Sequence, residues 1–178
     1  MALYTGKGDG GTTKIFGCDQ KRISKSSELP EALGSLDELN AYLGFVKMRA
    51  EYSPRIKNAV AAVQQALFIV QAQTAGADKK LAEGVVEEME QEIGKIENEI
   101  PPVTGFSVAG GTELSAVLDV TRTLARRAER RLIAVEEAGL RTMSPATKAY
   151  MNRLSSLLFA LARLANHEAG VQEENPKY

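Results

Sequence analysis

Apolar side chains recur at helical spacing through most of this chain, and that regularity limits its fold more than any other feature. Between residues 29 and 50 they return every three or four positions, at Leu33, Leu36, Leu39, Leu43 and Val46. This spacing places them on one face of a helix. No segment alternates apolar and polar residues for long enough to predict a strand. The pattern therefore predicts an all-α protein.

Turn and capping residues divide the remaining sequence into four more helices. Pro54 suits the first turn of a helix that ends at about residue 75, before Gly76. Residues 78–98 form a third, amphipathic helix. Thr112 is a suitable N-cap for a fourth, which runs to about residue 137. Ser144 followed by Pro145 begins a fifth that ends near Gly170, so we expect a five-helix bundle.

The 178 residues are expected to form one domain with three parts. Residues 1–27 are rich in Gly, Lys, Thr and Ser without periodicity, which predicts an N-terminal glycine-rich loop. Residues 28–170 form the helical bundle. Residues 171–178 are a polar tail, which we expect to be frayed.

Composition argues against several classes of protein. With 22 Lys+Arg against 23 Asp+Glu, no overall charge directs the chain to nucleic acid or to an anionic membrane. The single cysteine, Cys18, excludes a disulfide framework and favours a reducing compartment. The N-terminus lacks the apolar stretch of a secretory signal, and the most apolar segment, residues 59–72, is too short to span a membrane. We therefore expect a cytoplasmic protein.

The stretch RTLARRAERR at 122–131 holds five arginines and one glutamate. On the fourth helix, Arg122, Arg126 and Arg130 lie four residues apart, in a row that starts at the edge of the apolar stripe. Such a row is typical either of a solvated helix face or of a polyphosphate site, because arginine can bond two oxygens at once. A nucleic-acid surface is less favoured, since the second and third helices offer few cations.

Two other stretches have both a structural and a functional interpretation. TGKGDGGTTK at 5–14 is neither a Walker A loop nor a GxGxxG after a strand, yet its glycines would let backbone N–H groups approach an anion. A frayed N-terminus is equally consistent with it. In GSLDELNAYLG at 34–44, Ser35 and Glu38 have capping-box spacing. Asp37 borders the apolar row and needs a partner, for which Arg122 is a candidate.

The last helix carries a leucine stripe and a polar side. We expect Asn152, Ser156, Arg163 and Asn166 to gather with Phe159 opposite the leucines. Asn152 could contact an adenine or ribose edge through its amide, although an exposed asparagine on a helix is commoner.

Five collinear motifs resemble those of the PduO-type ATP:corrinoid adenosyltransferases: YTGKGDGGTT, LGSLDELN, FSVAGGT, RTLARRAER and MNRLSSLLFALAR. The resemblance runs from about residue 4 to 166 and implies a trimer of five-helix bundles with ATP bound between neighbouring subunits. It implies transfer of the 5′-deoxyadenosyl group of ATP to the cobalt of cob(I)alamin, giving adenosylcobalamin and triphosphate. A reductase and an adenosylcobalamin-dependent enzyme would then be partners.

The resemblance also implies roles for individual residues. The phosphate-binding loop would comprise Thr5, Gly6, Lys7, Gly8, Asp9, Thr13 and Lys14, with Lys25 joining it if a short insertion lies near 18–21. The nucleotide would be held by Arg126, Arg127, Glu129, Arg130 and Asn152, and Mg²⁺ would accompany it, with no metal ligands assigned. Asp37 and Arg122 match an intersubunit salt bridge beside the corrinoid. Phe106 matches the aromatic on the lower axial face of cobalt, and these three join Arg126 and Arg130 as the catalytic set.

The chemistry implied by the resemblance needs no nucleophile from the protein, because cob(I)alamin is itself one. His167 and Cys18 therefore need no role. The chain departs from the family pattern at Gly10, Ala109 and Ser156, where lysine, proline and aspartate are usual. Two other functions remain open: a non-catalytic carrier that delivers corrinoid or ATP to a partner enzyme, and a purely structural helical module.

Overall fold

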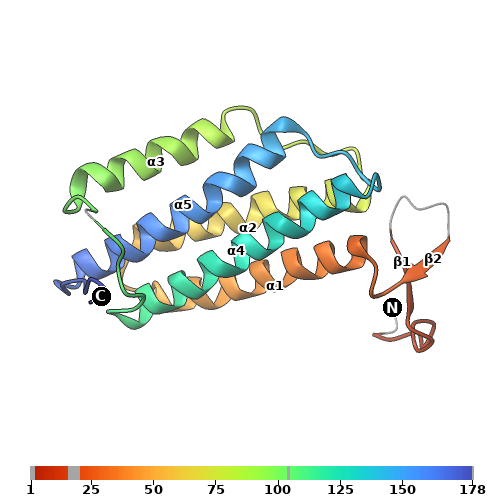
Figure 1. Cartoon of the computed structure of the whole chain (residues 1–178), viewed down its shortest axis with the longest axis horizontal. Coiled ribbons are helices and arrows are strands. Elements are labelled where there is room, and N and C mark those ends of the chain that lie inside the picture. The colour runs from red at the N-terminus through yellow and green to blue at the C-terminus, as the bar shows by residue number, and fades with distance from the viewer. Residues whose placement is uncertain (1–2, 16–20, 104, 178) are drawn as a thin grey trace.

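The computed structural model describes residues 3–15, 21–103 and 105–177. Its helices are α1 (Glu28–Arg49), α2 (Pro54–Ala75), α3 (Val85–Glu99), α4 (Glu113–Glu137) and α5 (Pro145–Glu168). They lie along one long axis, with α3 on the outside of the bundle next to α5 (Figure 1). Helix α1 packs on α2 and α4, and α5 packs on α4 and α3. The predicted five-helix, all-α architecture is confirmed.

The apolar stripes predicted from the sequence form the core. On α1, Leu36, Leu39, Leu43 and Val46 are fully buried, whereas Leu33 is only partly buried. Helix α5 is the most enclosed element, since leucines and alanines cover most of its circumference. Its position between α3 and α4 explains this composition, and only a few of its residues, such as Asn152, Arg153 and Ser156, remain exposed.

Helix α2 contains the most apolar segment of the sequence. Val60, Val63, Leu67 and Val70 are buried on its inner face, and Phe68 on its outer face is 58% exposed. Among the helices of the described residues, none is both long and apolar enough to cross a bilayer.

The predicted helix ends are confirmed at four places. Thr112 Oγ1 accepts a hydrogen bond from Ser115 N (3.1 Å), and Ser144 Oγ accepts one from Thr147 N (3.1 Å), so both residues cap their helices. Pro54 and Pro145 each occupy a first-turn position, where the missing N–H costs nothing.

One predicted helix boundary was wrong, and one possible cap is not used. The third helix begins at Val85 rather than at residue 78, because Gly84 adopts a left-handed conformation with φ 82°. Ser35 does not cap a helix, since α1 already begins at Glu28 and Ser35 lies buried inside it. Helical spacing alone could not separate a capping serine from one within the first turns.

The sequence had predicted that the N-terminal region is entirely loop, but the structure contains two short strands there. Strand β1 (Thr12–Lys14) pairs antiparallel with β2 (Arg22–Ser24), and Thr13 lies opposite Ile23. Three residues per strand are too few to show an alternating pattern. The ribbon lies beyond the end of the bundle at which α1 begins and α4 ends (Figure 1).

Two glycines with positive φ precede α4, and α5 packs into the turn that they form. Gly110 has φ 116° and Gly111 has φ 102°. Asn166 Oδ1 accepts a hydrogen bond from Thr112 N (2.9 Å), and its Nδ2 donates one to Gly110 O (2.9 Å). A Cβ at Gly111 would lie 2.5 Å from Asn166 Oδ1, whereas one at Gly110 would meet nothing within 4 Å.

We expect Gly111→Ala to destabilise the chain more than Gly110→Ala. Both variants impose positive φ on alanine, which costs roughly 1–3 kcal/mol. Only the first also displaces Asn166, which is 1% exposed, and leaving its amide unpaired costs about 1–3 kcal/mol more. Urea unfolding of the two variants checks this, and equal losses of unfolding free energy would contradict it.

Candidate functional site

Two arginines of α4 are tied to α1. Arg127 forms an ion pair with Glu38, and Arg131 Nη2 lies 3.3 Å from Glu31 Oε1. All four side chains are roughly half exposed, so these pairs contribute little to stability. They do neutralise two cations within the chain, including Arg127, which the resemblance assigns to the nucleotide.

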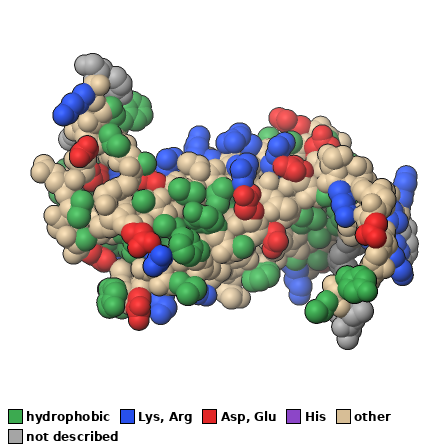
Figure 2. All heavy atoms as spheres, turned by 90° about the horizontal axis from the view of Figure 1, so that it is seen from below, with side chains coloured by type: hydrophobic (Ala, Val, Ile, Leu, Met, Phe, Trp, Pro, Cys, Tyr) green, Lys and Arg blue, Asp and Glu red, His purple; other side chains and the backbone are tan. Residues whose placement is uncertain are grey.

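Arg126 and Arg130 differ from their neighbours because neither has an acidic partner among the described residues. Both are exposed, and the guanidinium of Arg130 donates a hydrogen bond only to the main-chain oxygen of Arg126 (3.1 Å). Figure 2 shows Lys and Arg side chains gathered along one edge of the face viewed there. Two unpaired guanidinium groups, four residues apart on one helix, are suited to an anionic ligand with several oxygens.

Glu129 and Asn152 connect α4 to α5 next to this arginine pair. Asn152 Nδ2 donates a hydrogen bond to Glu129 Oε1 (3.0 Å), and Asn152 Oδ1 accepts one from Arg153 (2.7 Å). Both polar ends of the Asn152 amide are thereby occupied. The structure thus brings together two residues that are 23 positions apart in sequence and that the sequence analysis assigned to one ligand.

The glycine-rich loop folds back on itself through tight turns. Asp9 N donates to Gly6 O (3.2 Å), and Gly11 N donates to Gly8 O (3.1 Å). Gly6 and Gly11 have positive φ, which only glycine adopts without strain. The exposed side chain of Lys7 lies on the first of these turns. Thr13 and Lys14 follow on β1.

Lys25 joins this loop across the short β-ribbon. Its main-chain N donates to Gly11 O (2.9 Å), and its ammonium nitrogen would lie 3.1 Å from a Cβ placed on Gly8. The close approach of Lys25 to Gly8 agrees with the sequence-based grouping of these residues. The insertion invoked near 18–21 and Cys18 fall largely in residues 16–20, outside the described residues.

Phe106 and Arg122 border a second region, an open cavity of about 450 Å³. Its walls come from α3, the following loop, α4 and α5, and include Ile93, Ser156 and Phe159. Phe106 is 79% exposed, so little of the ring is packed against the protein. An exposed aromatic beside a partly apolar cavity is a feature of ligand sites rather than of a core.

Asp37 does not meet Arg122 within the chain. Asp37 is exposed and borders a hollow between α1 and α2 that also includes Phe68. Arg122 Nε instead lies 3.7 Å from Asp119 Oδ1 on its own helix. The inference that Asp37 sits at a core edge and needs Arg122 there was wrong for the single chain, because its position on α1 faces solvent.

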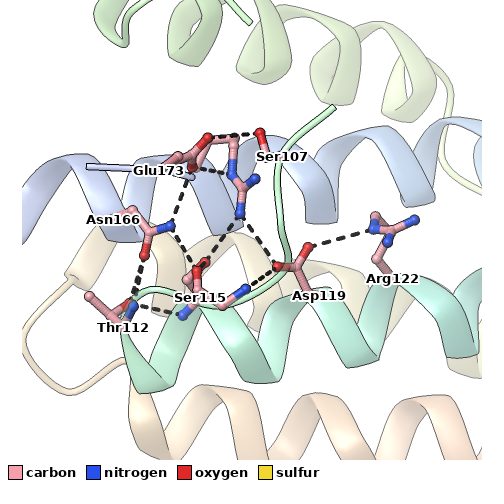
Figure 3. Close-up of polar contacts among 9 residues, drawn as sticks. Ser107, Thr112, Ser115, Asp119, Arg122, Asn166 and Glu173 are labelled. Carbon is pink, nitrogen blue, oxygen red and sulfur yellow. Dashed lines mark hydrogen bonds and ion pairs between the residues drawn. The ribbon is translucent and has the colours of Figure 1, made fainter. Parts of the chain in front are cut away.

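Sequence reasoning missed a group of buried and partly buried charges that we call the Arg163 cluster: Arg163, Asp119, Glu173 and Arg122. Figure 3 shows Asp119, Arg122 and Glu173 among the polar contacts of this region. Arg163 was expected on a polar side of α5, but it is 3% exposed. Its Nη2 lies 3.4 Å from Asp119 Oδ2, and its Nε is paired with Glu173 from the C-terminal tail. The signal available in the sequence was an arginine enclosed by leucines and alanines, LARLA, which needs a buried partner.

Protein ligands for a metal are not grouped in the described part of the chain. No set of three or more His, Cys, Asp and Glu side chains within residues 3–15, 21–103 and 105–177 could hold an ion. His167 is exposed near the end of α5, as a histidine without a required role would be.

Comparison with known proteins agrees with this geometry. The family described as Cobalamin adenosyltransferase matches residues 3–165 of the chain. The Corrinoid adenosyltransferase PduO of Citrobacter freundii is 37% identical over 177 residues, covering 95% of this chain and 51% of that protein. The chain thus spans about half the length of that relative. The Corrinoid adenosyltransferase of Bacillus subtilis is 33% identical, and the match covers 96% of this chain and 90% of that protein.

Solved structures show the same fold at full length. A variant PduO-type ATP:corrinoid adenosyltransferase from Lactobacillus reuteri, complexed with cobalamin and ATP, superposes with a TM-score of 0.91 at 28% identity. The match covers 99% of this chain and 97% of that one. The family indicated by the five sequence motifs is confirmed: this chain belongs to the cobalamin adenosyltransferase family.

Proposed function

We propose that this chain transfers the 5′-deoxyadenosyl group of ATP to the cobalt of cob(I)alamin and releases triphosphate. The observation that carries the proposal is the exposed pair Arg126 and Arg130, which lacks acidic partners among the described residues and lies on the motif that identifies the family. The names of the relatives, and the cobalamin and ATP in the Lactobacillus reuteri complex, support the two substrates.

In this reaction no side chain of the protein has to form a covalent bond. The electron pair of Co(I) attacks C5′ of ATP, a cobalt–carbon bond forms, and the C5′–O bond breaks with its electrons going to the triphosphate. The protein must hold C5′ in line with cobalt and stabilise the negative charge that grows on the leaving group. Orientation and preorganised charge are the two largest general contributions to such a transfer.

The triphosphate side of the site would consist of Arg126 and Arg130 together with the lysines of the glycine-rich loop. Lys7 and Lys25 lie on turns whose backbone is held by hydrogen bonds. The segment that carries them lies beyond one end of the bundle (Figure 1). Mg²⁺ bound to the phosphate oxygens would supply further positive charge, consistent with the absence of a protein metal cage among the described residues.

The corrinoid side would use Phe106 and Arg122. An apolar ring has no lone pair to offer cobalt, so Phe106 on its lower face would exclude an axial ligand. The resulting four-coordinate cob(II)alamin would be easier to reduce. The cavity of about 450 Å³ next to Phe106 is smaller than a whole corrinoid, which agrees with a site that is completed by another subunit.

A homotrimer belongs to the same proposal. Asp37 faces the hollow between α1 and α2, whereas Arg122 faces the cavity between α3 and α5. The salt bridge implied by the resemblance would therefore join Asp37 of one subunit to Arg122 of the next. Phe68, exposed beside Asp37, and the apolar side chains in the middle of the face in Figure 2 are consistent with surfaces that a neighbour covers.

The proposed substrates also indicate where the protein acts. Cob(I)alamin needs a reductant, so we propose a cytoplasmic location, a reductase that supplies the electron and an adenosylcobalamin-dependent enzyme that receives the product. The chemistry of the reaction supports each of these.

The direct test is an anaerobic assay with chemically reduced cob(I)alamin, MgATP and purified protein. Decay of the cob(I)alamin absorption together with growth of a light-sensitive alkylcobalamin spectrum would establish the transferase. A constant spectrum, with a thermal shift on adding MgATP, would instead favour the non-catalytic carrier. Ligand at about 100 times its dissociation constant adds roughly 2.7 kcal/mol to the free energy of unfolding, which a thermal shift detects.

Arg126→Ala is expected to lower kcat by about 10²–10³-fold, the usual effect of removing one preorganised donor from a developing negative charge. Arg131→Ala is the matched control, since Arg131 lies on the same helix and is paired with Glu31. Its kcat should stay within about twofold of the parent, because removing a half-exposed ion pair changes little. Steady-state rates of the two variants measure the difference, and similar losses would argue against a specific role for Arg126.

Phe106→Ala is expected to abolish most corrinoid turnover while leaving the MgATP thermal shift unchanged. The ring is 79% exposed, so its loss should cost little stability. Tyr52→Ala removes another aromatic, 93% exposed, from the turn between α1 and α2 and should keep parental rates. A Phe106→Ala protein with normal turnover would remove Phe106 from the proposed mechanism.

A further inference from the structure

The exposed ring of Phe106 needs an anchor, because its own packing cannot fix its position. We define the Phe106 loop as residues 105–111. Gly110 O accepts hydrogen bonds from Asn166 Nδ2 (2.9 Å) and Ser115 Oγ (2.9 Å). Three donors of the loop are also held by the rest of the chain: Ser107 Oγ donates to Glu173 Oε2 (3.1 Å), Val108 N to Glu174 O (2.8 Å) and Gly110 N to Asp119 Oδ2 (3.1 Å). Two of these three attachments come from the C-terminal tail, which the sequence had indicated to be frayed.

The two carboxylates that hold the loop are themselves held by one buried cation. Arg163 lies between Asp119 and Glu173, and it is 3% exposed (Figure 3). A guanidinium in such a place needs a charge partner, since an unpaired buried charge is strongly unfavourable. Asp119 still pairs with Arg163 when Glu173 is removed. The Arg163 cluster contains two cations and two anions, so their formal charges cancel.

The same cluster sets the position of Arg122. The two carboxylate oxygens of Asp119 have different partners. Oδ2 pairs with Arg163 and accepts a hydrogen bond from Gly110 N, and Oδ1 lies 3.7 Å from Arg122 Nε. Arg122 and Phe106 border one cavity. Arg163 also lies over the ring of Phe159, another cavity residue, with 5.0 Å between Cζ and the ring centroid.

We propose that Glu173 is a positioning residue for the corrinoid side of the site, acting through Ser107 and Arg163 on the Phe106 loop. The inference rests on the proposed function. Glu173 belongs to a tail outside the helical bundle, and its side chain is 25% exposed, so its removal can loosen the loop without unfolding the core. Residues that only support the fold would be expected inside the bundle.

The principal test compares Glu173→Ala with Glu168→Gln. Glu168 is an exposed carboxylate five positions earlier, with no ion pair or side-chain hydrogen bond in the described structure. We expect Glu173→Ala to lower kcat/KM for the corrinoid by about tenfold or more, because small displacements of a positioned group have large effects on rate. It should also lower the fraction of four-coordinate cob(II)alamin seen by electron paramagnetic resonance with MgATP. The KM for ATP should stay parental in both variants.

A second variant tests whether Glu173 acts through the loop. Ser107→Ala removes the loop's side of the same hydrogen bond, so its effect and that of Glu173→Ala should not add in the double variant. Fully additive effects on the corrinoid kcat/KM, or a Glu173→Ala protein that matches Glu168→Gln, would overturn the proposal.

Hydrogen exchange separates this proposal from the proposed function. Glu173→Ala should speed amide exchange in residues 105–110 whether or not the protein forms a cobalt–carbon bond. It removes the Ser107–Glu173 hydrogen bond beside Val108 N and the tail's ion pair with Arg163, so the remaining hydrogen bonds of the loop should open more often. Unchanged exchange there would refute the anchoring of the loop. A parent protein without transferase activity but with the faster exchange in the variant would refute the proposed function alone.

Discussion

The ion pairs of the buried Arg163 with Asp119 and Glu173 are the interaction on which the Phe106 side of the candidate site depends. Arg163 lies on an enclosed stretch of α5 and is only 3% exposed, so its charge must be neutralised by the chain itself. The carboxylates that do so come from α4 and from the tail, and each also holds the loop before α4. A requirement of the core thereby fixes the position of a loop on the surface.

The arginines of α4 fall into two groups, those with an acidic partner and those without one among the described residues. Those facing α1 meet Glu31 and Glu38, and the one nearest the N-terminus of the helix meets Asp119. Arg126 and Arg130 are exposed and have no carboxylate partner among the described residues. The helix therefore keeps part of its positive charge available, although the chain as a whole has a net charge of −1. Local arrangement, rather than overall composition, makes this part of the helix suited to the proposed anionic ligand.

The single chain presents its candidate site residues on separate surfaces. The glycine-rich loop lies beyond one end of the bundle, Phe106 and Arg122 border a cavity next to α3 and α5, and Asp37 faces the groove between α1 and α2. A reaction between two large substrates requires these groups to converge. The proposed trimer would achieve this because one subunit's α1–α2 surface can meet another's cavity.

The sequence by itself determined the helices and the family. Apolar spacing, together with Thr112, Ser144 and the prolines at first-turn positions, fixed the bundle because these signals act within a few residues. The five motifs were sufficient to identify the family. Tertiary structure alone decided which charges were partnered: it buried Arg163 and Asn166, joined Arg122 to Asp119 and exposed Asp37. Such pairings connect residues far apart in sequence, and helical periodicity does not record whether a polar side chain will face solvent or another helix.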